Sequence, residues 1–236
     1  MNIALITAAG IATRMHQAVP KQFLEVYDKP IVIYTLEAFQ KHPDIDAIVV
    51  VCLEGWETIL QDYCKQFKID KLESIVCGGE NSQDSIRNGL YDIASRHSKE
   101  DLVIVHDGNR PMVSQDVISD CIQTAYKHRI AVAAIPCIEA ILKTSDGLVS
   151  VEQIERDGVR RTQTPHGVFL GDLLGAHEEA RQKGITASVA TCTLYIELGR
   201  KVYFSQGAEK NIKITTPEDL EIFKAFLNAE RDNRLS

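Results

Sequence analysis

A loop of small residues near the N-terminus is the first candidate for chemistry. Residues 2–9 are mostly apolar and predict a strand, and residues 7–13 read Thr-Ala-Ala-Gly-Ile-Ala-Thr. Small side chains after a strand let backbone N–H groups approach a phosphate closely. The loop matches neither GxGxxG nor a Walker A motif, because Gly10 is its only glycine and no GK[ST] follows. Taken alone, these residues fit a tight strand-to-helix turn as well as a phosphate site.

Two cations near this loop favour the phosphate interpretation. Arg14 and Lys21 are seven residues apart in a stretch that otherwise reads as loop. Such a pair suits transfer on a polyphosphate, because negative charge accumulates on the phosphoryl oxygens and on the leaving pyrophosphate. The net charge of −7 gives no general attraction to nucleic acid or to an anionic membrane. An anionic ligand must therefore be captured locally.

Two later segments add polar groups after predicted strands. Gly78 and Gly79 follow the third strand and open a helix, and Asp107 ends the fourth. Ligands of open α/β sheets bind at this carboxyl edge. Asp107 could hold Mg²⁺ between its carboxylate and substrate phosphates, or it could cap a helix or pair with an arginine. The two glycines could equally form a turn before a helix cap.

The elements that must position these residues alternate along the chain. Apolar runs predict strands at residues 2–9, 47–53, 73–77, 102–106 and 130–137, and amphipathic stretches predict helices at 30–42, 56–67 and 81–96. Helix caps are expected at Asn81 or Ser82, at Ser114 and at Thr216 before Pro217. Continuous apolar strands separated by helices indicate a parallel sheet covered on both faces. We therefore expect one α/β domain over residues 1–236, a Rossmann-like three-layer fold with a mostly parallel sheet.

Residues 139–161 interrupt this alternation. Two short strands, at 141–144 and 149–154, flank Ser145-Asp146-Gly147, a hairpin signal with an Asp-Gly turn. A hairpin inserted into a βα alternation often projects and meets a partner, so this segment predicts a β-arm that forms a homodimer.

Several features narrow the location and the chemistry. No basic segment precedes an apolar stretch and no apolar run is long enough to span a membrane, so we expect a cytoplasmic protein. The six cysteines have no metal-binding spacing and are expected to be reduced core residues. The histidines show no metal-ligand spacing either, and His106 is expected to pack at a strand end rather than to act as an acid or base.

Together these segments resemble the cytidylyltransferases that make CDP-activated polyols, the methylerythritol phosphate and ribitol phosphate enzymes. The resemblance covers nearly the whole chain and consists of six ordered motifs, at residues 8–15, 20–23, 78–85, 106–111, 163–165 and 211–220. It implies a fold of the nucleotidyltransferase type. It also implies a reaction in which a polyol phosphate oxygen attacks the α-phosphorus of CTP and releases pyrophosphate. Such a nucleophile is largely ionised at neutral pH and needs no general base.

The resemblance implies a role for each matching residue. Arg14 and Lys21 match the residues that stabilise the pentacovalent phosphorus, and Asp107 matches the acid beside Mg²⁺, the implied cofactor. The residues that position the polyol phosphate are Arg156, Lys213, Thr186 and Arg110. The positions that contact CTP are Ala8, Ala9, Gly10, Ile11, Ala12, Thr13, Gly79, Glu80, Ser85 and Asn109. We expect Arg14, Lys21, Arg156 and Lys213 to converge on one cleft.

Three departures from the family pattern affect the acceptor more than the nucleotide. Ala12 replaces a usual glycine, Ala187 stands where an acid follows Thr186, and Ala140 stands where methylerythritol enzymes commonly carry threonine. Trp56 resembles a tryptophan of the ribitol branch, but it could also pack on the following helix. Both acceptors, 2-C-methyl-D-erythritol 4-phosphate and ribitol 5-phosphate, therefore stay open.

Two other functions compete with transfer. The departures would also suit a nucleotide-binding homologue without transfer activity that serves as a partner or regulatory subunit. A nicotinamide-dependent dehydrogenase is the weaker alternative, because no acidic ribose partner is placed after a recognisable second strand.

Overall fold

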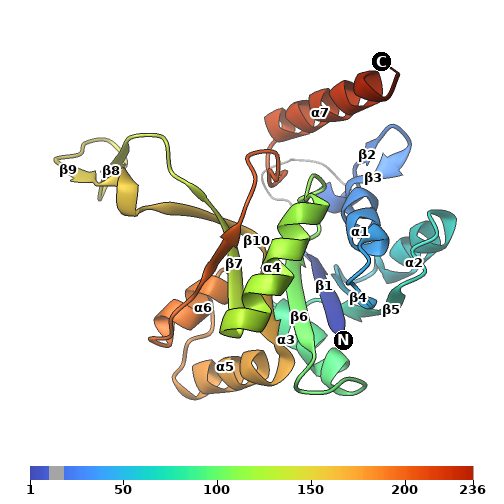
Figure 1. The fold of residues 1–236 in the computed structure, drawn as a ribbon, viewed down its shortest axis with the longest axis horizontal. Coiled ribbons are helices and arrows are strands. Elements are labelled where there is room, and N and C mark those ends of the chain that lie inside the picture. Colours follow the sequence, from blue (N-terminus) through green and yellow to red (C-terminus); the bar gives the residue numbers. More distant parts are fainter. Residues whose placement is uncertain (11–18, 236) are drawn as a thin grey trace.

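The computed structural model describes residues 1–10 and 19–235, and a seven-stranded sheet forms the centre of the described fold (Figure 1). The strand order is β11-β7-β10-β6-β1-β4-β5. Strands β6, β1, β4 and β5 run parallel, and only β10 is antiparallel to its neighbours β6 and β7. The bounds are β1 Asn2–Ala8, β4 Ala47–Cys52, β5 Leu72–Cys77, β6 Leu102–Asp107, β7 Ile130–Pro136, β10 Arg160–Phe169 and β11 Phe204–Gln206. The predicted mostly parallel sheet is confirmed.

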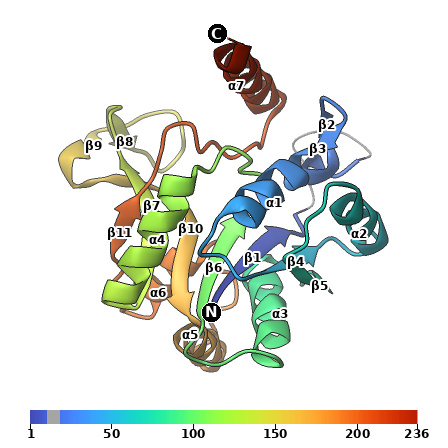
Figure 2. The same ribbon diagram turned by 45° about the vertical axis from the view of Figure 1, so that its right-hand side comes forward.

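Helices cover both faces of this sheet (Figure 2). Strand β1 explains why, since Ala4 and Ile6 point into one core and Ile3 and Leu5 into the other. The first face packs α1 (Ile31–Lys41), α2 (Glu57–Gln66) and α4 (Gln115–His128), and the second packs α3 (Ser82–Ala94), α5 (Leu170–Gln182) and α6 (Thr191–Glu197). The three-layer prediction is therefore confirmed.

The expected helix starts are present. The side chain of Asn81 accepts a hydrogen bond from the N–H of Asp84 at 3.0 Å, and that of Ser114 accepts from Val117 at 3.3 Å. Thr216 accepts from the N–H of Asp219 and so caps α7 (Pro217–Leu235). Helix α7 lies outside the two helix layers and packs near the small hairpin of β2 (Glu25–Val26) and β3 (Lys29–Pro30).

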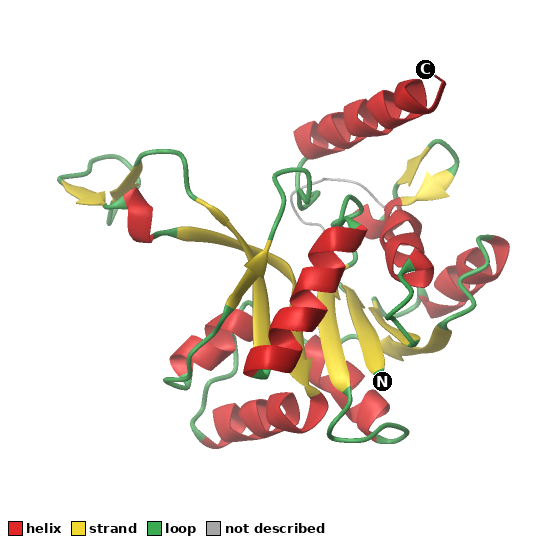
Figure 3. Cartoon of the chain, in the orientation of Figure 1, coloured by secondary structure: helices red, strands yellow, loops and turns green. Residues whose placement is uncertain are grey.

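The β-arm projects away from the sheet beyond the ends of β7 and β10 (Figure 3). Its two strands, β8 (Ile141–Lys143) and β9 (Glu152–Ile154), pair antiparallel, and a short 3-10 helix, Arg156–Gly158, leads into β10. Asp146 organises the turn by accepting from the N–H groups of Leu148 and Val149. The second strand is shorter than predicted, because Val149 accepts a bond from Thr144 inside the turn instead of pairing across the hairpin.

Strand β10 carries no apolar run at its start and was not predicted. It begins with Arg160-Arg161-Thr162-Gln163, includes Pro165, and shifts register against β7 between Thr162 and His166. Proline cannot donate to a ladder, so pairing breaks there and residues 163–165 are available for tertiary contacts. All six cysteines are free, and all but Cys77 are buried. Within the described part of the chain, we find no helix with the length and apolarity needed to cross a membrane.

Candidate active site

A cleft of about 740 Å³ opens at the carboxyl ends of β1, β4, β5 and β6. This is the edge at which open α/β sheets bind ligands. Four strand ends supply most of its wall, and one residue, Lys213, comes from the far end of the chain. The lining comprises residues 7–10, Lys21, Gln22, residues 53–54, residues 78–82, Ser85, Asp107, Asn109, Val189 and Lys213.

Two glycines bring the second loop against the first. A Cβ at Gly78 would collide with the Cβ of Ala9, so only glycine allows the loops to approach this closely. The N–H of Gly79 donates to Ser85 Oγ at 3.0 Å at the start of α3. This bond and the Asn81 cap hold the loop against the start of α3, and residues 78–82 line the cleft. The turn at Gly78 and Gly79 is thus also part of the cleft wall.

Lys21 reaches the cleft on a short 3-10 helix, Lys21–Phe23, with two anchors. The buried amide of Gln22 donates to the main-chain carbonyl of Ala8 at 2.7 Å. Phe23 stacks on Trp56, with ring centroids 4.6 Å apart and planes 28° apart. Trp56 therefore packs, but against Phe23 rather than on the following helix, and the pair ties Lys21 to the loop after β4.

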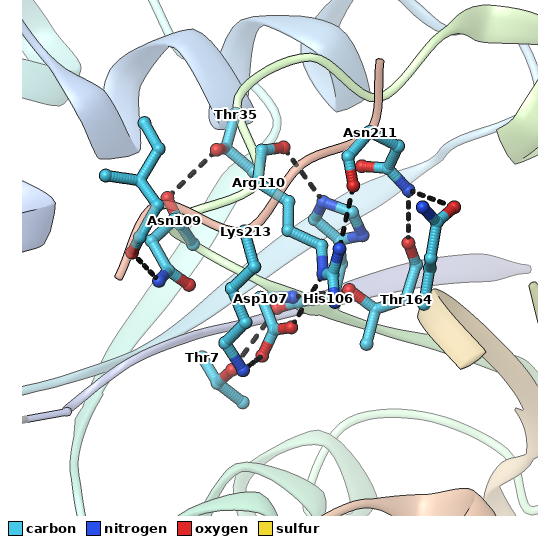
Figure 4. Close-up of polar contacts among 12 residues, drawn as sticks. Thr7, Thr35, His106, Asp107, Asn109, Arg110, Thr164, Asn211 and Lys213 are labelled. Atoms are coloured by element: carbon cyan, nitrogen blue, oxygen red, sulfur yellow. Dashed lines mark hydrogen bonds and ion pairs between the residues drawn. The ribbon is translucent and has the colours of Figure 1, made fainter. Parts of the chain in front are cut away.

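Asp107 ends β6 with both carboxylate oxygens in ion pairs (Figure 4). Arg110 Nε lies 3.0 Å from Oδ2, and Lys213 Nζ lies 3.1 Å from Oδ1. Burial alone would raise the pKa of Asp107, but the ammonium of Lys213 and the guanidinium of Arg110 outweigh it and hold the pKa well below its usual range. The carboxylate is therefore ionised at neutral pH. The arginine-partner interpretation of Asp107 is confirmed.

Asn109 explains how Lys213 comes to face β6. Its side-chain amide donates to the carbonyl of Ile214 at 2.5 Å, and the N–H of Ile214 donates back to the carbonyl of Asn109 at 2.9 Å. This reciprocal pair joins segments 105 residues apart in the chain. It holds the segment that carries Lys213 against the loop after β6.

Several predicted residues do not line the cleft. We expected four cations to converge on one cleft, and within one chain this prediction is wrong for Arg156. Arg156 lies in the β-arm, donates to the carbonyl of Ile138, and lines a separate hollow of about 320 Å³ with Ala140 and residues 153–157. The arm projects from the sheet and carries Arg156 away from the cleft. Thr186 is exposed outside the cleft wall, while Val189 enters it.

Arg110 also stands behind the wall, where it contacts Asp107 rather than the cleft. The predicted residues that do line the cleft are Ala8, Ala9, Gly10, Lys21, Gly79, Glu80, Ser85, Asp107, Asn109 and Lys213. Ile11, Ala12, Thr13 and Arg14 lie outside the described residues.

Sequence reasoning missed Gln22, Leu53, Glu54 and Val189 in the wall. Leu53 and Glu54 directly follow β4, so the rule that ligands meet strand ends could have found them. His106 behaves as expected, since it is fully buried, its ring packs 5.0 Å from that of Phe39, and burial lowers its pKa to about 3.

Comparison with known proteins gives a consistent set of matches. The family model described as 2-C-methyl-D-erythritol 4-phosphate cytidylyltransferase matches residues 2–229. A ribitol-5-phosphate cytidylyltransferase of Lacticaseibacillus paracasei is 38% identical over 96% of this chain and 98% of its own. A 2-C-methyl-D-erythritol 4-phosphate cytidylyltransferase of Desulforamulus reducens is 36% identical over 95% of each. The crystal structure of the Francisella tularensis 2-C-methyl-D-erythritol 4-phosphate cytidylyltransferase superposes with a TM-score of 0.79 at 28% identity, covering 94% of this chain and 97% of that one.

Proposed function

The chain belongs to the 2-C-methyl-D-erythritol 4-phosphate cytidylyltransferase family, whose members transfer CMP from CTP to a polyol phosphate, and we propose that its own acceptor is ribitol 5-phosphate. The main support is the Lacticaseibacillus paracasei relative, which carries that acceptor in its name and aligns over nearly the full length of both chains. The departures at Ala140 and Ala187 also support an acceptor other than methylerythritol phosphate. Ala140 lines the hollow around Arg156, where a methyl group offers no hydrogen bond to a hydroxyl.

The acceptor is tested by pyrophosphate release from CTP and Mg²⁺ with a panel of polyol phosphates. We expect kcat/KM for ribitol 5-phosphate to exceed that for 2-C-methyl-D-erythritol 4-phosphate by at least about 10-fold, since a site built for one set of hydroxyls leaves polar groups unpaired with another. Erythritol 4-phosphate and glycerol 3-phosphate serve as shorter controls. Equal or faster turnover of the methylerythritol substrate would contradict the proposal.

The cleft can support the transfer with few groups. Backbone N–H groups of residues 9–10 can hold the triphosphate, and we assign to Lys21 and Arg14 the stabilisation of charge on the α-phosphoryl group. Lys213 offers its ammonium to the acceptor phosphate. That phosphate is largely ionised near pH 7, so it attacks without a general base, and buried, neutral His106 supplies none.

Asp107 also fits the proposed Mg²⁺. The described residues contain no group of three or more His, Cys, Asp or Glu side chains that could hold a metal ion. Mg²⁺ characteristically takes only one or two carboxylates and completes its shell with substrate phosphates and water. One ionised carboxylate in the cleft wall meets that requirement if the ion replaces Lys213 beside Oδ1. Bound there, the ion would neutralise charge on the triphosphate.

We further propose that the enzyme is a cytoplasmic homodimer formed through the β-arm. The tip exposes Leu148, Val149 and Val151, and Val151 is fully exposed, which is costly for apolar side chains in an isolated chain. Pairing two arms would cover these residues and would let Arg156 of each chain approach the cleft of the other. CTP is consumed where it is made, and free thiols suit that reducing compartment.

A further inference from the structure

A closed circuit of hydrogen bonds links the end of β6 to β10 and to the segment before Lys213 (Figure 4). The N–H of Asp107 donates to Thr164 Oγ1 at 3.0 Å, and the carboxylate of Asp107 accepts from Arg110 Nε at 3.0 Å. Arg110 Nη1 donates to the main-chain carbonyl of Asn211 at 2.7 Å. The side-chain amide of Asn211 closes the circuit by donating to the carbonyl of Thr164 at 2.8 Å.

Asn211, like Arg110 and Thr164, is a member of this circuit that does not line the cleft. It is fully buried and absent from the cleft wall, yet its neighbour two residues on, Lys213, lines it. Gln163 holds the preceding bend, since its amide donates to the carbonyl of Ala208 at 2.9 Å and its oxygen accepts from the N–H of Ala208 at 3.1 Å. The position of Asn211 therefore sets both where Arg110 is held and where the chain delivers Lys213.

We propose that Asn211 is a positioning residue for CMP transfer, acting through Arg110 on Asp107 and through the chain on Lys213. A buried amide that donates to a main-chain carbonyl fixes the backbone more tightly than packing alone, because leaving that carbonyl unsatisfied is costly. Displacing catalytic groups by about 1 Å can cost roughly 10²-fold in rate. The inference requires only the transfer reaction and holds for either polyol phosphate.

The first test replaces Asn211 and a matched control. Asn211→Ala removes the amide that closes the circuit, whereas Asn88→Ala removes an exposed amide that donates to the carbonyl of Cys77 at 3.2 Å. We expect kcat/KM for the polyol phosphate to fall about 10- to 100-fold in the first variant and less than about 3-fold in the second. KM for CTP should change by less than about 3-fold in Asn88→Ala, and in Asn211→Ala it should change less than kcat/KM for the polyol phosphate, because the loop of residues 7–10 lies on another segment. Rates are measured with whichever polyol phosphate the wild-type enzyme turns over, so failure of the ribitol assignment leaves this test intact.

The second test asks whether Asn211 acts through Arg110. Arg110→Lys keeps a positive charge beside Asp107 but cannot bond the carboxylate and the carbonyl of Asn211 together. We expect this variant to fold and to lose at least about 10-fold in kcat/KM, and adding Asn211→Ala should cost less than it does alone, because only its effect through the chain on Lys213 remains. Full activity of folded Asn211→Ala would overturn the proposal, as would multiplied losses in the double variant. Should Asn211→Ala fail to fold, wild-type kcat/KM in Arg110→Lys would overturn it instead.

Discussion

Lys21 and Lys213 are the two described lysines that line the cleft, and Lys21 is the one we assign to the transfer step. Gln22 and Phe23 anchor Lys21 through Ala8 and Trp56. Lys21→Ala should lower kcat by at least about 100-fold, since a donor aimed at developing charge contributes about 3 kcal/mol. Steady-state kinetics with saturating CTP measure this. Lys65→Ala, at an exposed lysine of α2 that pairs with Asp62, is the control, and unchanged turnover of Lys21→Ala would remove Lys21 from the mechanism.

His177 gives a prediction for stability rather than activity. It is buried in α5 without a hydrogen-bond partner for either ring nitrogen in the described part of the chain, and burial lowers its pKa to about 4, with Arg87 adding to the effect and Asp84 opposing it. The unfolded chain protonates this ring near pH 6.5, so between pH 6.5 and pH 4 the unfolded state binds more protons. The free energy of unfolding should therefore fall as the pH falls, by roughly 1 kcal/mol per pH unit from this residue.

His177→Leu removes the titrating ring and should flatten that dependence by about the same amount. Urea unfolding at pH 7 and pH 5 measures the difference. His106 and His166 have pKa values lowered to about 3 and about 4 by the same cause, so the His177→Leu variant should still lose some stability over this range. An unaltered slope in His177→Leu would contradict the assignment.

The sequence predicted many individual site residues because each sits directly after a strand or inside an ordered motif. Gly79, Asp107 and Asn109 are examples, and Lys213 was found by its motif alone. Arg156 and Thr186 were placed wrongly for one chain, because spacing along the sequence does not reveal the direction in which a hairpin or loop leaves the sheet. The circuit through Asn211 was invisible for the same reason, since it joins three segments that only folding brings together.

Among the strands, the sequence predicted the limits well where both faces of the strand are buried, and it missed β10, of which one end is exposed and the other buried. Strands β1, β4 and β6 are continuous apolar runs, so their limits differ from the prediction by one residue at most. Strand β10 starts exposed and polar and ends buried, so no single periodicity describes it. Strand β11 has only three residues and draws its stability from parallel pairing with β7, a tertiary effect that local sequence does not encode.

The short helix Lys21–Phe23 has an aromatic stack as one of its two anchors, which gives a prediction at the scale of the element. Trp56→Ala removes the partner of Phe23 and should raise KM for CTP by about 3- to 10-fold, because such stacks contribute about 0.5 to 1.5 kcal/mol beyond burial. Tyr126→Ala removes an aromatic contact with Phe169 far from the cleft and is the control. Unchanged KM in Trp56→Ala would show that Lys21 does not need the stack.

Trp56 is the single tryptophan of the chain, so its emission reports directly on this element. Titration of wild-type protein with CTP should change the fluorescence, since Leu53 and Glu54, just before Trp56, line the cleft. A silent titration, with binding proved independently by calorimetry, would mean that the helix and its stack stay unaffected by nucleotide.

Over the whole molecule, the net charge of −7 makes the binding of two phosphorylated substrates a matter of local arrangement. Lys21 and Lys213 come from opposite ends of the chain, and the same cleft also holds Glu54, Glu80 and Asp107. The cleft is therefore not a uniformly positive surface. Backbone N–H groups and a few oriented cations must bind the anions, which favours small phosphorylated ligands over extended polyanions.

The role of Arg156 depends on whether two chains assemble through their β-arms. Arg156 lines a separate hollow of the β-arm and not the cleft of its own chain, so in the proposed dimer it would serve the cleft of the second chain. Arg156→Ala and Lys21→Ala should each be impaired as purified homodimers. When the two variants are combined and exchange subunits, half of the dimers contain one chain of each variant. Each such heterodimer has one cleft that holds an intact Lys21 of its own chain and an intact Arg156 of the partner chain. Activity should therefore recover to about a quarter of the wild-type value. A mixture no more active than its components would show that the arm does not act across chains.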